Sequence, residues 1–505
     1  MIDAQSLHTY TNTSGNTITI KKPYTDDWSA EGYLRWAISC GLLEYVKISD
    51  QCRITDLGIK LANAADDSPQ EKDTLSEALL SYPPVIRILN LLKDQNNQTK
   101  FDLGSKLGFK GELGFTSLPQ AVYLCDYGEA PSSSERAKVK SNDEGDSDKY
   151  ARGIASWLLQ MGWIETSNQT VTDTYRGRTY TAPIQTYSIT RAGEKALIKA
   201  KGNSRNPRLP RIVMFEMLAS NKAPGSNYLR YQRACLLKAF SATEKTLVQL
   251  QNTLKGYDLD MDLSAIKDHI SGLQAIGIDI SVKGNKYRLH DKIKNLDIPA
   301  RSICIKDNVN DIKDRVRKKL KTLDHQYLIL IDLAYSDAAS KTRKNADARE
   351  FEIQTAKLFT KELSFQGMRL GDSGKPDVII SWDSYGTIID NKSYKDGFNI
   401  SAGSRDEMSR YINENRMRSS TLNPNVWWVN FDPKVKNFTF LFVTSYLKGN
   451  FENQLKYISA ANGGIKGGAI NVENLLYLSE GLKSGKLTPV DFYGNFNNKE
   501  MLFPL

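Results

Sequence analysis

The sequence predicts a multidomain α+β protein in which three tandem winged-helix-like modules precede an α/β domain. Three observations support this fold class. The chain has 505 residues, more than a single hydrophobic core usually serves. A short motif occurs twice in the first two hundred residues, and a hairpin pattern with charged residues lies in the last two hundred. The predicted boundaries are 1–80, 81–205 and 206–298 for the modules, 299–310 for a linker and 311–505 for the last domain.

The repeated motif is Ile-Thr-x-x-Gly-x-Lys, which occurs at Ile54 to Lys60 and again at Ile189 to Lys195. A helix that ends at a glycine and a short β-rich stretch precede each copy. Helix, strand, turn and strand in this order is the pattern of a winged helix. A third copy without the Ile-Thr signature runs from Ile266 to Leu289, with a turn at Gly284-Asn285. Three such modules are therefore expected in tandem.

The second module contains a candidate DNA-reading helix. In helix-turn-helix proteins, the helix before the wing usually enters the major groove. Here it is predicted to start near Ser147, and Lys149 and Arg152 share one of its faces because they lie three residues apart. Arg and Lys can bind guanine, and Glu144, in the loop just ahead, can accept from cytosine, so the three are candidate base contacts. The alternative is a solvated helix face with an acid near its N-terminus.

Changes of composition mark the remaining connections. The segments 199–210 and 295–307 are predicted to separate domains, because the first is basic with two prolines and the second follows the third module. Residues 130–148 are Ser-rich, charged and without periodicity. They are predicted to form a long loop inside the second module, either ordered by a ligand or disordered.

Composition excludes several classes of protein. No apolar run is long enough to span a bilayer, and the start of the chain has neither a basic nor an apolar targeting region, so a cytoplasmic protein without membrane association is expected. Five widely spaced cysteines argue against a disulfide framework and a zinc site, and we expect them to be reduced and mostly buried. The net charge of +10 suits a polyanionic partner, although such modest charge is also common on proteins that bind no nucleic acid.

The last domain contains a candidate metal-dependent nuclease site. Residues 377–382 and 387–390 are rich in β-branched residues and flank turn residues, which predicts a hairpin. Side chains alternate along a strand, so Asp390 and Lys392 should share one face with Asp377 beside them, while Asn391 points away. Clustered carboxylates repel each other unless a hard cation such as Mg²⁺ binds them. The cluster predicts hydrolysis of phosphodiesters, with Asp377 and Asp390 as metal ligands, although Asp-x-Lys also occurs by chance.

Many ordered segments of the chain resemble the FokI-like type IIS restriction endonucleases, and together they cover nearly the whole sequence. In the N-terminal half, the matching segments are Asp27-Trp28-Ser29, Gly32 to Ala37, Ser81 to Pro84, Gly114 to Pro119 and Ser147 to Arg152. In the C-terminal half, they are Lys375-Pro376-Asp377, Asp390-Asn391-Lys392, Asp406-Glu407-Met408, Asn423-Pro424-Asn425, Trp427-Trp428 and Lys448-Gly449-Asn450.

The resemblance implies modules that read an asymmetric double-stranded DNA site and a restriction-endonuclease-like (PD-D/ExK) domain that cuts at a fixed distance outside it. By matching position, Asp377, Asp390 and Lys392 correspond to the catalytic residues, with a shortened hairpin loop between the two aspartates. Glu352, on a helix predicted from Glu350 to Phe365, matches an acid of the nuclease fold, and its alternative is a surface glutamate. A separate methyltransferase that acts on the same site is also implied.

The resemblance extends to dimerisation and to recognition. The helix from Arg405 to Arg418 resembles the family's dimerisation helix, in which Asp406 and Arg410 would pair across a two-fold axis in a transient homodimer; locally they are also spaced for an i, i+4 salt bridge.

Trp28, Glu144, Lys149 and Arg152 match DNA-contacting positions, and a site related to GGATG is expected. The family's longer N-terminal arm is largely missing, so we expect either a misassigned start or a different way of reading the site. The alternatives are a strand-specific nickase and a DNA-binding protein with a degenerate nuclease domain.

Overall fold

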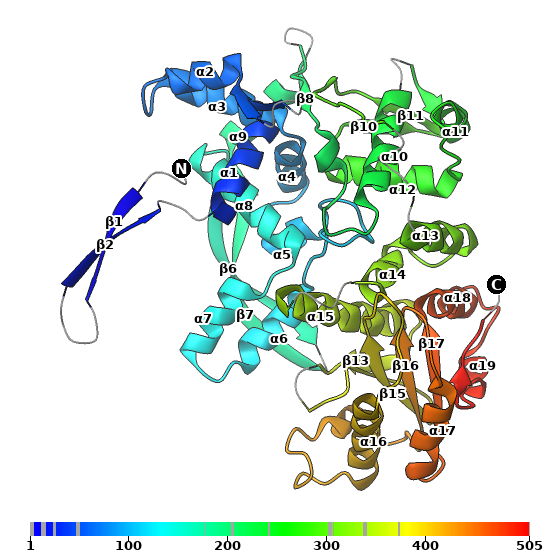
Figure 1. Ribbon diagram of the computed structural model, residues 1–505. Helices are drawn as coiled ribbons and strands as arrows, with labels where there is room; N and C mark the ends of the chain where they lie inside the picture. The colour runs from blue at the N-terminus through cyan, green and yellow to red at the C-terminus, as the bar shows by residue number, and fades with distance from the viewer. Residues whose placement is uncertain are drawn as a thin grey trace.

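The computed structural model describes residues 5–11, 17–23, 27–46, 51–175, 177–203, 207–240, 243–300, 306, 308–336, 341–371 and 374–503. The modules occupy one half of the molecule and the C-terminal domain the other, and β1 and β2 form a hairpin that extends away from the body (Figure 1). The hairpin consists of β1 (Gln5–Thr11) and β2 (Thr17–Pro23). Among the described residues, no helix combines the length and the apolar composition needed to cross a bilayer.

The first module is a helix followed by a small antiparallel wing and two further helices. Its elements are α1 (Asp27–Ser39), β3 (Leu43–Val46), β4 (Gln51–Ile54), α2 (Asp56–Ala62) and α3 (Pro69–Ser81). The two strands pair with each other only, in the register Leu43 with Ile54. This order contains the helix, strand, turn and strand that the motif at Ile54 predicts.

The second module repeats that order with a much longer wing. Its helices are α4 (Pro83–Asp94), α5 (Lys100–Gly104), α6 (Gln120–Glu129), α7 (Ser133–Asn142), α8 (Asp146–Gln160) and α9 (Arg191–Lys201). Its strands are β5 (Gln98–Thr99), β6 (Ile164–Tyr175) and β7 (Arg178–Ile189), in the order β5-β7-β6. The predicted reading helix is α8, which begins one residue before the expected position.

The duplicated motif has the same structural role in both modules. Thr55 and Thr190 are the N-caps of α2 and α9, and each hydroxyl accepts a hydrogen bond from the backbone N–H of the glycine three residues later. Each hydroxyl also donates, at 2.7 Å, to the carbonyl of the glycine that ends the preceding helix. A Cβ at the motif glycine would lie 2.2 Å from a backbone oxygen in the first copy and 2.1 Å in the second. In both modules the motif therefore fixes the end of the wing against the turn that follows the preceding helix, through the threonine hydrogen bonds and the close packing of the glycine.

The third module has the predicted helix and wing with further helices around them. Its helices are η1 (Phe215–Leu218), α10 (Ser226–Ala239), α11 (Leu247–Lys255) and α12 (Leu263–Ala275). Its strands are β8 (Arg211–Ile212), β9 (Lys245–Thr246), β10 (Ile280–Lys283), β11 (Lys286–Leu289) and β12 (Ile293–Lys294). One core fills this module, whereas a second core is shared by residues of the first two modules, including Cys40, Leu80 and Ile154.

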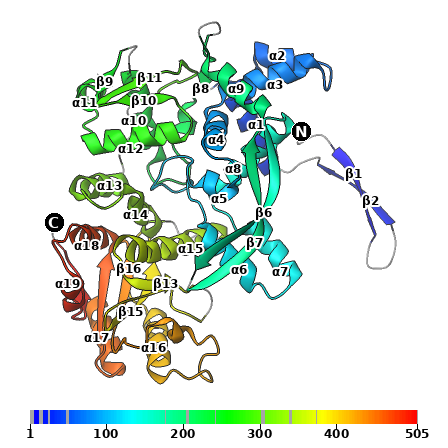
Figure 2. The same cartoon turned by 180° about the vertical axis from the view of Figure 1, so that it is seen from behind.

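The C-terminal domain is a six-stranded mixed sheet between two layers of helices (Figure 2). Its strands, in sheet order, are β13 (Gln366–Arg369), β14 (Val378–Trp382), β15 (Tyr385–Lys392), β16 (Asn437–Thr444), β17 (Lys466–Asn471) and β18 (Lys499–Glu500). The first three strands pair antiparallel, and β15 to β18 pair parallel.

The helices cover the two faces of this sheet unequally. One face packs against α13 (Asn308–Lys319), η3 (His325–Leu328), α14 (Ile329–Ala334), α15 (Lys341–Lys357), η4 (Leu358–Glu362), α18 (Val472–Lys483) and α19 (Pro489–Gly494). The other packs against α16 (Ala402–Met417), η5 (Trp427–Asn430) and α17 (Phe451–Ala461). Along β15, Ile389 faces the first layer and Ile388 the second, because strand side chains alternate. Asp390 therefore belongs to the α16 face and Asn391 to the α15 face.

The helix α15 is one of the elements through which the C-terminal domain contacts the modules. Arg349 binds Asp126 on α6 and lies 3.6 Å from Asp143, the residue between α7 and Glu144. Ile353, one turn further along α15, is buried in the core of the second module with Tyr123 and Ile184. This helix therefore contacts both the second module and the sheet of the C-terminal domain.

Two predicted elements differ from the structure. Residues 130–148 are not one long loop, because α7 occupies 133–142. Ser132 caps α7 by accepting from Glu135 N–H, but none of its residues is buried, so it has no apolar periodicity to detect. The helix predicted from Glu350 begins earlier, at Lys341, and continues after Lys357 as a π-helical segment.

The predicted state of the cysteines is confirmed where it is described. Cys40, Cys125 and Cys235 are buried and Cys52 is exposed, all as free thiols. Cys304 lies outside the described residues.

Candidate functional site

The three predicted catalytic residues come together at one end of the β14–β15 hairpin. Val378 pairs with Ile389, so Asp377, just before β14, lies beside Asp390. The backbone N–H of Asn391 donates to Asp377 Oδ2 at 2.7 Å, which fixes that carboxylate against β15. Lys392 Nζ lies 2.8 Å from Asp390 Oδ2. The expected hairpin and the shared face of Asp390 and Lys392 are both confirmed.

The two carboxyl groups are held in an environment that disfavours their charged forms. Burial and the nearby Asp390 and Glu352 raise the pKa of Asp377 well above its usual range. Burial also raises the pKa of Asp390, which is 3% exposed, although Lys392 opposes this effect. The pair therefore carries an electrostatic cost that a bound cation would remove.

Lys392 keeps its positive charge at this site. Burial alone would lower the pKa of its ammonium group, but Asp390 and Glu407 outweigh burial and raise it. Glu407, on α16, lies 3.4 Å from Lys392 Nζ through its Oε2 and accepts from Tyr411 Oη at 3.1 Å through its Oε1. A protonated Lys392 can donate hydrogen bonds and offset negative charge, but it cannot accept a proton.

Glu352 supports the site from α15. Arg369 Nε on β13 donates to Glu352 Oε2 at 2.8 Å, and the charge of Glu352 contributes to the raised pKa of Asp377. One turn along, Thr355 Oγ1 accepts from Asn391 Nδ2 at 2.7 Å. Glu352 is thus a partly buried, ion-paired acid near the cluster rather than a surface residue.

The donor set fits a hard divalent cation. Asp390 Oδ2 is buried and, despite its closeness to Lys392, accepts no hydrogen bond of acceptable geometry. In the described part of the chain, no group of three or more His, Cys, Asp or Glu side chains is arranged around a common metal position. Asp377 and Asp390 are the adjacent buried carboxyl groups that could hold such a cation, and Mg²⁺ commonly binds one or two carboxylates and retains several waters.

The predicted reading helix presents the expected polar face. Lys149 and Arg152 on α8 are exposed, and Ser156 extends the same face by one turn. Ile154 and Leu158 are buried on the opposite side. The spacing that the sequence indicates is therefore confirmed.

Glu144 lies behind this face. Its side chain is 1% exposed, and it binds Lys100 Nζ at 2.8 Å and Arg152 Nη2 at 2.8 Å. Burial alone would raise the pKa of Glu144, but the hydrogen bonds from Arg152 and Lys100 outweigh burial and lower it. In this structure Glu144 is a charged anchor for Arg152, and its direct contact with a base stays a prediction.

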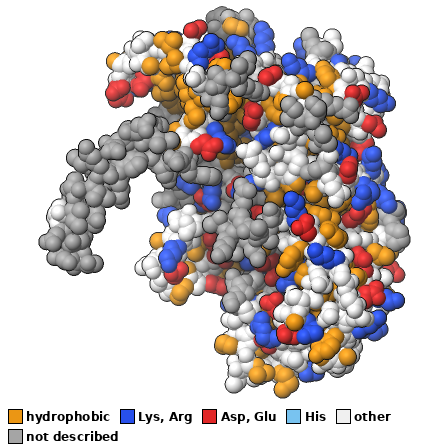
Figure 3. Space-filling model, viewed as in Figure 1, with side chains coloured by type: hydrophobic (Ala, Val, Ile, Leu, Met, Phe, Trp, Pro, Cys, Tyr) orange, Lys and Arg blue, Asp and Glu red, His pale blue; other side chains and the backbone are white. Residues whose placement is uncertain are grey.

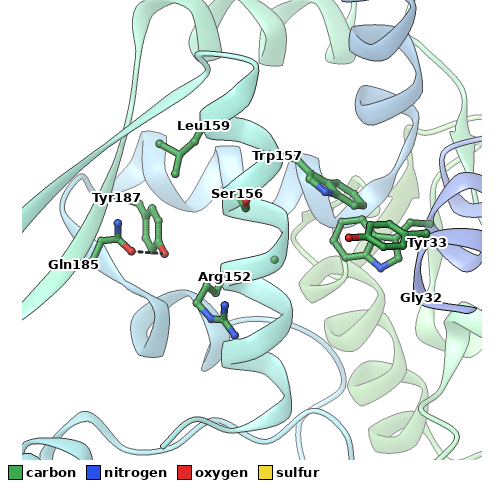
Figure 4. Close-up of a pocket in the computed structure, with 10 residues that line it drawn as sticks. Gly32, Tyr33, Arg152, Ser156, Trp157, Leu159, Gln185 and Tyr187 are labelled. Atoms are coloured by element: carbon green, nitrogen blue, oxygen red, sulfur yellow. Dashed lines mark hydrogen bonds between the residues drawn. The ribbon is translucent and has the colours of Figure 1, made fainter. Parts of the chain in front are cut away.

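A shallow cleft of about 610 Å³ opens beside Arg152 on α8. Tyr33 and Trp157 lie on one side of the helix and Gln185 and Tyr187 on the other (Figure 4). On the face of the molecule shown in Figure 3, Lys and Arg side chains are mixed with Asp and Glu rather than gathered in one large basic area. On this face, binding of a polyanion would therefore depend on local groups more than on one large basic area.

The other predicted site residues are Trp28, Asp406 and Arg410, and the structure describes their predicted contacts only in part. Trp28 lies in the first turn of α1, and its side chain is outside the described residues. The i, i+4 salt bridge that is the local alternative for Asp406 and Arg410 does not form among the described side chains, where Arg410 pairs with Glu414 at 3.3 Å and Glu407 at 3.9 Å; the pairing across a two-fold axis stays a prediction. Asp406 is 72% exposed and lies 3.4 Å from Arg405.

Sequence reasoning missed the residues that hold these groups in place. Lys100, Glu407 and Arg369 each bind a predicted site residue but lie on another element. Of these three, Glu407 lies in the segment Asp406-Glu407-Met408 that carries the family resemblance, and that position is the sequence signal that could have pointed to it. Trp427 Nε1 and Asn423 Nδ2 both donate to Glu414 and so anchor α16, which explains two further segments of that resemblance.

Four family models match the chain in order. They are the FokI recognition domain subdomain 1 at residues 2–64, recognition domain subdomain 2 at 71–205, the FokI D3 domain at 218–285 and the FokI cleavage domain at 306–502.

Two curated proteins and two solved structures are similar to almost the whole chain. The type II restriction enzyme FokI of Planomicrobium okeanokoites is 38% identical over 96% of this chain and 83% of its own length. The type II restriction enzyme StsI of Streptococcus sanguinis is 32% identical over 92% and 78%. The structures of FokI alone and of FokI bound to DNA superpose with TM-scores of 0.87 and 0.86, at 38% identity; both cover 95% of this chain, and 84% and 83% of the respective structure.

Proposed function

Because this chain belongs to the FokI family and is a type II site-specific deoxyribonuclease, we propose that it is a type IIS enzyme. It binds an asymmetric site on double-stranded DNA through its modules and hydrolyses phosphodiesters at a fixed distance outside that site. The observation that carries this proposal is the separation of two charged clusters, one at Asp390 on the nuclease sheet and one at Arg152 on α8, on different parts of the chain.

The cofactor of the proposed reaction is Mg²⁺, with Asp377 and Asp390 as its protein ligands. When bound, Mg²⁺ supplies Lewis-acid polarisation of the phosphodiester and acidification of water. The ammonium of Lys392 orients the attacking water and offsets negative charge that develops on the phosphate. Glu352 acts indirectly, since it holds Arg369 and contributes negative charge beside Asp377.

The proposed recognition surface is the exposed face of α8. Arg152 and Lys149 are available for guanine or phosphate contacts, and Glu144 fixes the Arg152 guanidinium. Trp28 is proposed as a further contact by its position in the resemblance. A site related to GGATG is the proposed target, and a separate methyltransferase would protect it.

Double-strand cleavage is proposed to need a transient homodimer. One active site cuts one strand, and α16 presents an exposed Asp406 and a partly exposed Arg410 for a self-complementary contact. Substituting Arg410→Asp should suppress linear product while DNA binding stays nearly intact, because like charges would then meet at the two-fold axis. Plasmid cleavage and gel-shift assays measure the two effects, and unchanged linear product would count against the dimer.

Sequencing the ends of plasmid DNA cut in Mg²⁺ tests the main proposal. We expect discrete fragments with cuts at a constant offset from one asymmetric site, and no cutting by Asp390→Ala. Identical fragments from that variant would overturn the active-site assignment. Nicked circles without linear product at all enzyme concentrations would indicate a nickase, and binding without cutting in several divalent metals would indicate a degenerate nuclease domain.

A further inference from the structure

The β6–β7 hairpin has an uncharged polar face beside α8. The exposed β6 residues Thr166, Asn168 and Thr170 pair in register with Tyr187, Gln185 and Pro183 of β7. Since paired residues lie on the same face, Asn168 and Gln185 stand directly opposite each other. Gln185 lines the same cleft as Arg152 of the predicted reading helix, and Asn168 adds a second primary amide across the strand pair.

The position of Gln185 is defined by a buried tyrosine. Tyr187 Oη donates to Gln185 Oε1 at 3.2 Å, and Tyr187 itself is only 3% exposed (Figure 4). Gln185 is exposed and lines the same cleft as Arg152 and Ser156. Tyr187 and Arg152 line this cleft as well, and the charge of Arg152 opposes the rise that burial causes in the pKa of Tyr187. Arg152 and Gln185 therefore form adjoining parts of one surface.

We propose that Gln185, with Asn168 opposite it, is a second DNA-contacting element that donates hydrogen bonds to acceptor atoms of the duplex lying on α8. This inference rests on the proposed function of α8. Amide side chains bind both phosphate oxygens and base edges, and they do so without displacing counterions. Tyr187 is a positioning residue, because its hydroxyl holds the carboxamide of Gln185 toward the cleft.

Because the amide side chains of Gln185 and Asn168 carry no charge, their contact with DNA can be distinguished by the salt dependence of binding affinity. A lysine that binds phosphate releases counterions, so its loss reduces the dependence of affinity on salt. Loss of an amide contact lowers affinity and leaves that dependence unchanged. Loss of a basic group would change the salt slope and so would not produce this combination, whereas thermal unfolding of each variant is needed to detect a general loss of folding.

Binding to a synthetic duplex that carries the recognition site mapped from the cleaved ends, measured without divalent metal at several salt concentrations, tests the proposal. Gln185→Ala and Asn168→Ala should each bind roughly threefold to tenfold more weakly with the wild-type salt slope. Gln169→Ala is the matched control, because Gln169 is exposed on the opposite face of β6, one residue away. Its affinity should stay within about twofold of wild type.

Two outcomes separate failure of this inference from failure of the proposed function. If Arg152→Ala weakens binding while Gln185→Ala and Asn168→Ala behave like Gln169→Ala, the inference is wrong. If Arg152→Ala also binds like wild type, α8 is not the recognition helix. Duplexes with single substituted base pairs then report the kind of contact: a base contact relaxes sequence preference, and a phosphate contact weakens all duplexes alike.

The role of Tyr187 is tested by a double-mutant cycle. Tyr187→Phe should weaken binding in the wild-type background and have little further effect in Gln185→Ala, since its hydroxyl acts through Gln185. Equal losses in both backgrounds would overturn the positioning role. Thermal unfolding of each variant shows whether the aromatic core at this position is intact.

Discussion

The nuclease and recognition clusters use the same residue types in opposite proportions. At the nuclease sheet, the carboxyl groups of Asp377, Asp390 and Glu407 share one lysine, and the pKa values of Asp377 and Asp390 are raised. At α8, one carboxylate shares a lysine and an arginine, and the pKa of Glu144 is lowered. In both, a lysine Nζ lies 2.8 Å from a carboxylate oxygen. The two clusters therefore differ in the ratio of their charges and not in the ion pair itself, which is why we propose a cation at the first and a DNA contact at the second.

Replacing Lys392 or Lys100 by methionine should give the largest difference between the two clusters, measured as rate of cleavage against affinity for DNA. Lys392→Met should reduce cleavage more than about a hundredfold, because the phosphate loses a cation at the reacting centre, while DNA binding persists. Lys100→Met should lower binding of DNA and leave the rate of cutting of saturated enzyme nearly unchanged. Single-turnover cleavage and gel-shift assays separate the two effects. Comparable losses of cutting rate in both variants would contradict the division of roles.

Removing the acid of the recognition cluster should destabilise the protein at neutral pH. Glu144→Gln leaves Lys100 and Arg152 without their shared carboxylate, at a cost of about 1 to 3 kcal/mol in the free energy of unfolding. Since the folded-state pKa of Glu144 is lowered, its contribution is present above the unfolded-state value and disappears as pH falls through the folded-state value. Urea unfolding at pH 7 and pH 3 checks this. A constant difference between the two pH values would argue against the charged anchor.

At the nuclease cluster, the contribution of the carboxyl group to the free energy of unfolding should change with pH in the opposite direction and by a smaller amount. Asp377 has a raised folded-state pKa, so ionising it destabilises the metal-free protein as pH rises from the unfolded-state value through the folded-state value. Asp377→Asn should therefore stabilise metal-free protein by about 1 kcal/mol at pH 8 and by little at pH 4. Thermal unfolding in a chelator measures the difference, and Asp383→Asn, at an exposed turn of the same hairpin, is the control. Destabilisation by Asp377→Asn at pH 8 would refute the explanation.

The sequence predicts those parts of the two clusters that depend on local periodicity. Alternation along β15 is sufficient to place Asp390 with Lys392, and helical spacing is sufficient to place Lys149 with Arg152. Partners from other elements could not be predicted, since Glu407 and Lys100 reach their sites only through the packing of α16 and α5. Competition explains why Asp406 and Arg410 form no salt bridge within α16, because Glu414, held by Trp427, pairs with the guanidinium instead. The helix α7 was missed because it buries no side chain.

The two-residue turn at Asp383 and Ser384 has a consequence for how the chain can vary. Trp382 pairs with Tyr385 across this turn, and the ladder continues to Val378 and Ile389 without a bulge. Adding one residue to each strand would lengthen the hairpin and keep Asp390 opposite its neighbours, whereas adding one residue to β15 alone would turn Asp390 and Lys392 toward α15. Viable insertions and deletions in this hairpin should therefore come in matched pairs, and its length can differ among relatives while the chemistry at its base stays the same.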